Sequence, residues 1–170
     1  AAVYNKFDID ITMGVTAEAI NRTKKQLLLK DGAVLDYDKL VLTTGARVRK
    51  LDISGPNLDG VFYLRDLNDA QQIKKFTGVD KRALIIGGGY IGLETAAALR
   101  KLGMEVTVLE AQPRILQRVT TPEVAEFYTR IHKEEGVEIV TGVQAVSISG
   151  DTQVKLVQCQ NGTEYEADIV

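Results

Sequence analysis

Cysteine is nearly absent from this sequence of 170 residues, since Cys159 is the only one. A disulfide within the chain is therefore impossible, and no CxxC pair is present for thiol–disulfide chemistry. Long apolar runs are also lacking, and no segment approaches membrane-spanning length. Positive charge is not in excess, because 21 Lys and Arg stand against 23 Asp and Glu. These features argue against nucleic-acid and membrane partners, and they favour a reducing, cytoplasmic location.

Apolar residues make up 45% of the chain, which is enough for a packed core. The most informative stretch begins with a short apolar run at 83–86, which suits a buried parallel strand. A Gly87-x-Gly89-x-x-Gly92 motif follows it, then a helix-forming segment at 95–102 and a second apolar run at 106–109 that ends in Glu110. Strand, glycine motif, helix, strand and acidic residue in this order predict the βαβ unit of a dinucleotide-binding domain.

The spacing of this motif has a chemical reason. Gly87 permits a tight turn out of the strand, Gly89 lets the backbone approach a pyrophosphate, and Gly92 lets the helix pack on the sheet. The start of the helix offers unpaired N–H groups to phosphate oxygens. Glu110 can accept hydrogen bonds from a ribose 2′-hydroxyl and would repel a 2′-phosphate. The sequence therefore predicts binding of NAD in preference to NADP.

The rest of the chain predicts an α/β fold with a Rossmann-like parallel sheet, helices and an antiparallel β-meander. Helices are expected at 65–76 and, after Pro122, up to 135, and a third parallel strand at 137–140. Alternating or short apolar segments predict the other strands, at 7–13, 15–21, 26–30, 34–35, 40–42, 61–64, 142–149, 154–160, 163–167 and 168–170.

No side chain is expected to act as a catalytic acid or base. His132 is the only histidine, and its place before Gly136 predicts a surface or apolar-stripe position on a helix. No His, Cys, Asp or Glu spacing typical of a metal site is present. A cofactor would therefore supply the chemistry, while the protein binds and orients it.

The sequence resembles the flavin-dependent pyridine nucleotide-disulfide oxidoreductase superfamily over nearly its whole length, and its ferredoxin reductase branch most of all. That branch includes putidaredoxin and rubredoxin reductases. The superfamily resemblance is carried by Asp31-Gly32, residues 37–41, 44–47, Leu64-Arg65, 87–94, Gly136-Val137 and 167–170. The branch resemblance is carried by Arg114 to Thr120, Pro122 and Phe127-Tyr128.

The resemblance implies that an NAD-binding domain at 48–170 is joined to a partial FAD-binding segment at 1–47. It implies that Gly87, Gly88, Gly89, Tyr90, Ile91, Gly92, Glu94 and Glu110 form the NAD site, with Arg114 and Arg118 near the adenosine. It also implies that Val15, Thr44, Gly45, Ala46 and Arg65 lie near FAD. From the residues alone, a solvated helix residue is the better explanation of Glu94, and a charge at the start of a helix is an alternative explanation of Arg65.

The implied function is electron transfer from NADH through FAD to a ferredoxin-type iron–sulfur protein, with hydride passing to the flavin. Other members of the superfamily remain alternatives: an NADH oxidase or peroxidase, a nitrite reductase subunit, or an apoptosis-inducing-factor-like protein. A non-catalytic NAD-sensing module is an alternative of a different class. The family's first glycine motif and later Gly-Asp motif are not in the sequence, so we expect a piece of a longer flavoprotein that does not retain FAD tightly.

Overall fold

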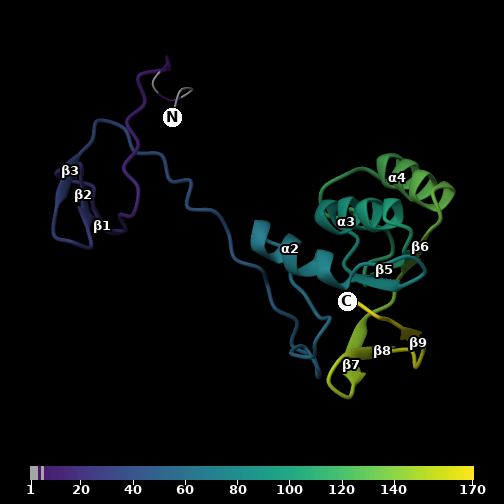
Figure 1. Cartoon of the computed structure of the whole chain (residues 1–170). Coiled ribbons are helices and arrows are strands. Elements are labelled where there is room, and N and C mark those ends of the chain that lie inside the picture. The colour runs from purple at the N-terminus through teal and green to yellow at the C-terminus, as the bar shows by residue number, and fades with distance from the viewer. Residues whose placement is uncertain (1–3, 5) are drawn as a thin grey trace. The chain divides into compact units, whose positions relative to one another are not determined.

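The structure is a computed structural model that describes residue 4 and residues 6–170. The chain forms two compact units, Ala1–Ala46 and Arg47–Val170 (Figure 1). The boundary between these units falls one residue before the 47/48 boundary expected from the sequence. The assignment of the two parts to FAD and NAD stays a prediction.

The first unit contains a small antiparallel sheet. Its strands are β1 (Ala17–Asn21), β2 (Gln26–Leu29) and β3 (Val34–Asp36), paired in the order β1-β2-β3. The β2–β3 turn is built on Gly32, whose φ of +87° lies in the left-handed region that glycine enters easily. The three strands predicted in this region are therefore confirmed, with bounds that differ by one or two residues.

Two strands predicted for the first unit are wrong. Residues 7–13 alternate in polarity and residues 40–42 are an apolar run, yet neither segment is a strand. Val41 and Leu42 keep 79% and 63% of their surface exposed. Among the described residues, no neighbouring strand donates or accepts ladder hydrogen bonds with either segment. An apolar pattern alone does not make a strand, because a strand needs a paired neighbour.

The second unit is built on a parallel sheet. Its strands are β4 (Arg82–Ile86), β5 (Glu105–Glu110) and β6 (Val137–Thr141), in the order β4-β5-β6. Helix α3 (Tyr90–Lys101) connects β4 to β5, and α4 (Pro122–Glu134) connects β5 to β6. The parallel strands and both connecting helices predicted from the sequence are confirmed.

Alternate residues of this sheet face two different cores, as the period of a strand requires. One face packs against the helices: Ala83, Val106, Val108 and Ile139 lie in a cluster with Leu93 and Ala96 of α3 and Ala125 of α4. The opposite face carries Leu84 and Leu109 into a second cluster with an antiparallel sheet. That sheet is β7 (Ala145–Gly150), β8 (Val154–Cys159) and β9 (Glu164–Glu166), in the order β7-β8-β9. Figure 1 shows α3 and α4 on one side of β5 and β6, and the β7–β9 sheet on the other.

Helix α2 (Leu67–Phe76) precedes the parallel sheet, and its start is fixed by side chains. Asp66 accepts from the Asp69 N–H at 3.0 Å, and Asp69 accepts from the Asp66 N–H at 3.0 Å, which is a reciprocal capping box. Its Ile73 and Phe76 pack on the helix-side core. The helix predicted at 65–76 is confirmed, with its start two residues later.

The strands predicted at 61–64 and 168–170 form only isolated contacts. Val61–Leu64 is not a strand, although the Phe62 N–H donates to the Val170 carbonyl at 2.8 Å. Ile169 makes a single parallel bridge with Ala83. A strand needs a longer series of paired residues, so neither segment is a strand. In the part of the chain that the structure describes, no helix has both the length and the apolarity needed to cross a bilayer.

Candidate dinucleotide site

The glycine turn leaves the carboxyl end of β4 in a conformation that only glycine adopts easily. Gly87 has a φ of +118°, and its N–H donates to the Leu109 carbonyl of β5 at 2.8 Å. A Cβ placed on Gly87 would have open space around it. Backbone conformation, and not crowding, is therefore what requires glycine at this position.

Gly89 and Gly92 differ in what a side chain would meet. A Cβ on Gly92 would lie 2.1 Å from the Gly87 carbonyl oxygen and 3.3 Å from Cγ2 of Ile85. Helix α3 could not then approach the strand, which confirms the packing role predicted for Gly92. A Cβ on Gly89 would meet no atom within 4 Å. Gly89 is exposed, so the absent side chain leaves room for a group from outside the protein.

The first turn of α3 presents backbone donors beside this space. Gly89 is the N-cap and makes no side-chain hydrogen bond there, and the first-turn N–H groups of a helix have no partner within it. Unpaired amides together with the positive end of the helix dipole attract anions. Open space at Gly89 and uncapped amides at the start of α3 therefore fit a pyrophosphate.

Glu110, the last residue of β5, lies directly against the turn. Its Oε2 accepts from the Gly88 N–H at 2.8 Å, and its Oε1 accepts from the Gln112 N–H at 2.8 Å. Each carboxylate oxygen has a further lone pair, so the group can still accept from ribose hydroxyls. The structure thus brings Glu110 to the glycine motif. The preference for NAD over NADP stays a prediction.

A loop of residues 114–120, which we call the 114–120 loop, follows Glu110 and covers the turn. Ile115 and Leu116 are buried, and Cγ2 of Ile115 would be only 2.7 Å from a Cβ on Gly88. Nη2 of Arg114 donates to carbonyls within the loop, and its Nη1 is buried without a partner among the described residues. Arg118 is exposed. Arg114 is thus directed at its own loop, and its predicted place near the adenosine stays a prediction.

The charge of Arg114 also reaches the start of α4. The pKa of Glu123 is lowered, first by a hydrogen bond from the Thr121 side chain and further by its own backbone N–H and the Arg114 charge. Thr121 is the N-cap of α4, and Pro122 occupies the first turn. An ionised Glu123 in that turn is also favoured by the helix dipole.

The side chains of Tyr90, Ile91 and Glu94 project from the first turns of α3. Tyr90 and Ile91 are 44% and 59% exposed, and the Tyr90 ring meets Tyr128 of α4 edge-on at 6.2 Å between centroids. Glu94 is exposed and makes no hydrogen bond or ion pair with any described residue. Their predicted contacts with the nicotinamide nucleotide stay predictions.

The residues predicted near FAD lie in both units. Val15, Thr44, Gly45 and Ala46 belong to the first unit and are exposed, and Gly45 has a φ of +76°. Arg65 lies in the second unit just before α2, where its N–H donates to Oδ2 of Asp69 at 2.7 Å. Their contact with a flavin stays a prediction.

Leu116 was not foreseen from the sequence, whereas His132 occupies one of its two expected places. Leu116 adopts a φ of +52° and donates its N–H to the Gly88 carbonyl at 2.9 Å. His132 is buried, although a surface position was one of its two expected places. Its Nε2 lies 3.1 Å from the Leu93 carbonyl of α3, and its Nδ1 lies 2.9 Å from the Tyr128 carbonyl. The helical stripe of α4 gave a signal for His132, but no sequence signal marks a left-handed leucine.

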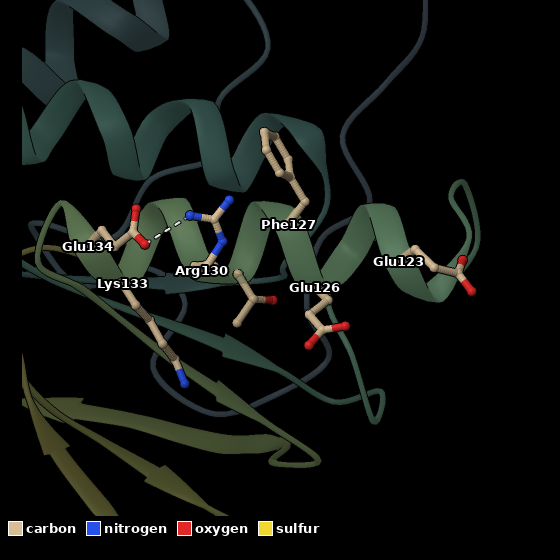
Figure 2. A pocket seen from close by; sticks show the side chains of 7 residues that line it. Glu123, Glu126, Phe127, Arg130, Lys133 and Glu134 are labelled. Carbon is tan, nitrogen blue, oxygen red and sulfur yellow. Dashed lines mark hydrogen bonds and ion pairs between the residues drawn. The ribbon is translucent and has the colours of Figure 1, made fainter.

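A shallow depression also runs along the exposed side of α4, lined by Glu123, Glu126, Phe127, Thr129, Arg130, Lys133 and Glu134 (Figure 2). The Arg130 guanidinium lies 5.6 Å from the Phe127 ring centroid and pairs with Glu134 at 3.0 Å. A single helix forms this surface, and none of its residues belongs to the predicted site. Among the described residues, no cluster of His, Cys, Asp and Glu has the arrangement of a metal site.

A parallel βαβ unit with a glycine turn, an uncapped helix start and an acidic residue after the second strand defines the class of dinucleotide-binding α/β domains. The comparisons with known proteins narrow this class. The sequence profile of the family described as pyridine nucleotide-disulphide oxidoreductase matches residues 3–170, and the chain belongs to this family.

Reductases of the branch that the sequence resembles are among the similar relatives. The chain is 43% identical to putidaredoxin reductase CamA of Pseudomonas putida, over 98% of this chain and 41% of that protein. It is 35% identical to rubredoxin-NAD(+) reductase of Ectopseudomonas oleovorans, over 98% of this chain and 44% of that protein. A solved covalent putidaredoxin reductase–putidaredoxin complex matches with a TM-score of 0.83 and 42% identity, over 99% of this chain and 42% of that one. The chain thus spans about two fifths of the length of the curated relatives it matches.

Proposed function

We propose that this chain is the NAD(H)-binding part of an FAD-dependent oxidoreductase that passes electrons from NADH to a ferredoxin-type iron–sulfur protein. The observation that carries the proposal is the contact between Glu110 and the Gly88 N–H, which places an acidic side chain on the glycine turn. The names of the relatives, putidaredoxin reductase and rubredoxin-NAD(+) reductase, support the acceptor class. A reducing, cytoplasmic location belongs to the same proposal.

In this proposal each part of the site has a binding task. The amides at the start of α3 hold the pyrophosphate above Gly89, and Glu110 accepts from the adenosine ribose. Tyr90, Ile91 and Glu94 line the way toward the nicotinamide. Val15, Thr44, Gly45, Ala46 and Arg65 contribute to the flavin side. When bound, NADH supplies a hydride and FAD supplies the step from hydride to single electrons.

The nucleotide preference tests the proposal on this chain. Calorimetry should show tighter binding of NADH than of NADPH, since Glu110 repels a 2′-phosphate. Glu110→Ala should reduce the ratio of the NADPH and NADH dissociation constants by about ten-fold, which corresponds to roughly 1.4 kcal/mol of binding free energy. Glu105→Ala, at the exposed start of the same strand, is the matched control and should leave the preference unchanged. Equal binding of the two nucleotides by the wild-type chain would contradict the proposal.

The acceptor is tested on the intact protein. Purified with its flavin, it should reduce a ferredoxin-type protein with NADH faster than it reduces oxygen or peroxide. Faster turnover with oxygen or peroxide would instead indicate an NADH oxidase or peroxidase. A colourless protein that binds NADH without a flavin absorbance band would point to a sensing module.

A further inference from the structure

Both backbone polar groups of Gly88 are hydrogen-bonded. Its N–H donates to Oε2 of Glu110 at 2.8 Å, and its carbonyl accepts from the Leu116 N–H at 2.9 Å. Gly88 is buried, whereas Gly89, the next residue, is exposed beside open space. The orientation of Gly88 therefore sets the direction in which Gly89 and the first amides of α3 face a phosphate.

Leu116 makes its contact with Gly88 from an unfavourable backbone conformation. Its φ of +52° lies in the left-handed region, where a leucine is strained, and its side chain is buried. The Leu116 carbonyl accepts from the N–H groups of Val119 and Thr120 at 3.0 and 3.1 Å. Such a conformation persists only where surrounding bonds hold it. Closure of the 114–120 loop is therefore what keeps the Leu116 N–H directed at Gly88.

The Arg114 side chain, at the start of the 114–120 loop, donates hydrogen bonds to two carbonyls later in the same loop. Nη2 donates to the Gln117 carbonyl at 3.1 Å and to the Thr120 carbonyl at 3.0 Å. The guanidinium is planar and its donors are fixed in direction, so one group can bond two carbonyls at once. A lysine in its place would keep the charge without that fixed geometry.

Arg118, four residues later, is in a different situation. It is exposed, and it makes no hydrogen bond or ion pair with any residue that the structure describes. Its charge is therefore free to attract an anionic ligand, with a strength that salt reduces. Two arginines of one loop thus offer different properties: one has fixed geometry and the other has free charge.

We infer that Arg114 is a positioning residue for the nucleotide site: it closes the 114–120 loop so that Leu116 holds the Gly88 carbonyl and the phosphate-facing amides stay in place. Arg118 supplies the attracting charge. This inference rests on the proposed function, because it deepens the role of the same site. Its effect on the ligand passes through Leu116 and Gly88.

Amide hydrogen exchange in the ligand-free chain tests the positioning role without any nucleotide. Arg114→Gln and Arg114→Lys should accelerate exchange of the Leu116 and Gly88 amides by on the order of ten-fold. Val108, in the middle of the parallel sheet, should keep its wild-type protection. Arg118→Gln should leave the exchange rates of the Leu116 and Gly88 amides unchanged. So should Arg130→Gln, a change at an exposed arginine of α4.

Calorimetric titration of NADH at low and high salt gives the second readout. Both Arg114 variants should weaken binding by about ten-fold, and Arg114→Lys should keep the wild-type salt dependence. Arg118→Gln should reduce the salt dependence while leaving loop exchange unchanged.

Any of three results would overturn the inference. The first is wild-type NADH affinity and wild-type amide exchange in Arg114→Lys. The others are unchanged exchange of the Leu116 and Gly88 amides in Arg114→Gln, or exchange at Val108 that is accelerated as much as at those two amides. If the wild-type chain does not bind NADH, the proposed function fails. The exchange measurements still decide whether Arg114 closes the loop.

Discussion

Two glycines of one motif illustrate how differently single residues are constrained in this chain. Gly92 is required by the protein itself, because a Cβ there would lie 2.1 Å from the Gly87 carbonyl oxygen. Gly89 is surrounded by open space and has a φ of −82°, which any residue adopts. Only a ligand would need Gly89 to lack a side chain. Stability and binding can therefore be separated by substitutions three residues apart.

Alanine substitutions at these positions should give opposite phenotypes. Gly92→Ala should lower the free energy of unfolding by roughly 1–3 kcal/mol, because the methyl group overlaps backbone that has little freedom to move. Gly89→Ala should keep wild-type stability within about 0.5 kcal/mol and weaken NADH binding. Urea unfolding and calorimetry measure the two effects. Wild-type NADH affinity in a folded Gly89→Ala variant would show that no phosphate approaches this backbone.

At this scale, the sequence predicted the residues whose chemistry is tied to their type. The place of Glu110 on the glycine turn follows from its position after the second strand. Gly87 follows from the tight exit of β4, which its φ of +118° confirms. Leu116 could not be predicted, because leucine is disfavoured at the φ of +52° that it adopts. Its conformation comes from loop bonds that no local pattern encodes.

At the scale of elements, His132 ties two helices together. It lies on α4, and its Nε2 is 3.1 Å from the Leu93 carbonyl of α3. His132 as a residue is only 9% exposed, so water does not replace this contact easily. Helix α3 carries the amides of the dinucleotide site at its start. The tie therefore helps fix α3 against α4.

Replacing His132 by leucine should loosen this tie. A leucine has similar volume but no ring nitrogen, so the Leu93 carbonyl would lose its side-chain partner. The free energy of unfolding should fall by about 1–3 kcal/mol, measured by urea denaturation. Lys133→Ala, on the exposed side of the same helix, should change it by less than about 0.5 kcal/mol. Equal stability of His132→Leu and wild type would contradict a stabilising tie.

Strand β4 is joined to residues that follow β9. Asp168 accepts from the Arg82 N–H at 2.8 Å and pairs with its guanidinium at 3.3 Å. The side-chain hydrogen bond from Arg82 is the largest cause that lowers the pKa of Asp168, and burial opposes it. Glu166 also pairs with Arg82. One arginine therefore connects the parallel sheet with the segment leaving the antiparallel sheet.

Acid should weaken this connection. Since the folded-state pKa of Asp168 lies below the ordinary value of about 3.9, its contribution to stability is present above that pH. It is lost as the pH falls through the lowered folded-state value. The free energy of unfolding should therefore drop more steeply below about pH 4 in wild type than in Asp168→Asn. Parallel curves from pH 6 to pH 2 would show that Asp168 contributes nothing.

Elements whose signal is local were predictable from the sequence, and those that depend on a distant partner were not. Helix α4 follows from Pro122 and an apolar stripe, and β4 to β6 follow from apolar runs between glycines. The apolar run at 40–42 gave an equally good strand signal, yet it has no paired neighbour among the described residues. In residues 61–64, the Phe62 N–H donates to the Val170 carbonyl, more than a hundred positions later. Periodicity does not report such pairings.

At the scale of the whole molecule, the two units differ in how much core they have. Among the described residues of Ala1–Ala46, only Leu29 is buried. Phe7, Met13 and Val41 keep 64%, 86% and 79% of their surface exposed. The Arg47–Val170 unit has two buried clusters, one on each face of the parallel sheet. A sheet of three short strands with so little burial is marginally stable in water.

Limited proteolysis should therefore cleave the two units at different rates. In the chain studied alone, we expect cleavage first within residues 6–46, leaving a resistant product that begins near residue 47. The β1–β3 amides should also exchange faster than those of β4–β6. Mass spectrometry of the cleavage products checks this. Early cleavage within β4–β6 would contradict the expected order.

The pairing of β4 with residues 168–170 has a consequence for how the protein is made. Arg82 and Asp168 are 86 positions apart, so a ribosome that has completed β4, α3 and β5 has not yet supplied the residues that cover the free edge of β4. Until Ile169 arrives beside Ala83, that edge exposes unpaired backbone groups to other chains. Crowded synthesis and slow translation between β5 and β9 should therefore favour aggregation of the nascent chain, even after the glycine turn has been synthesised.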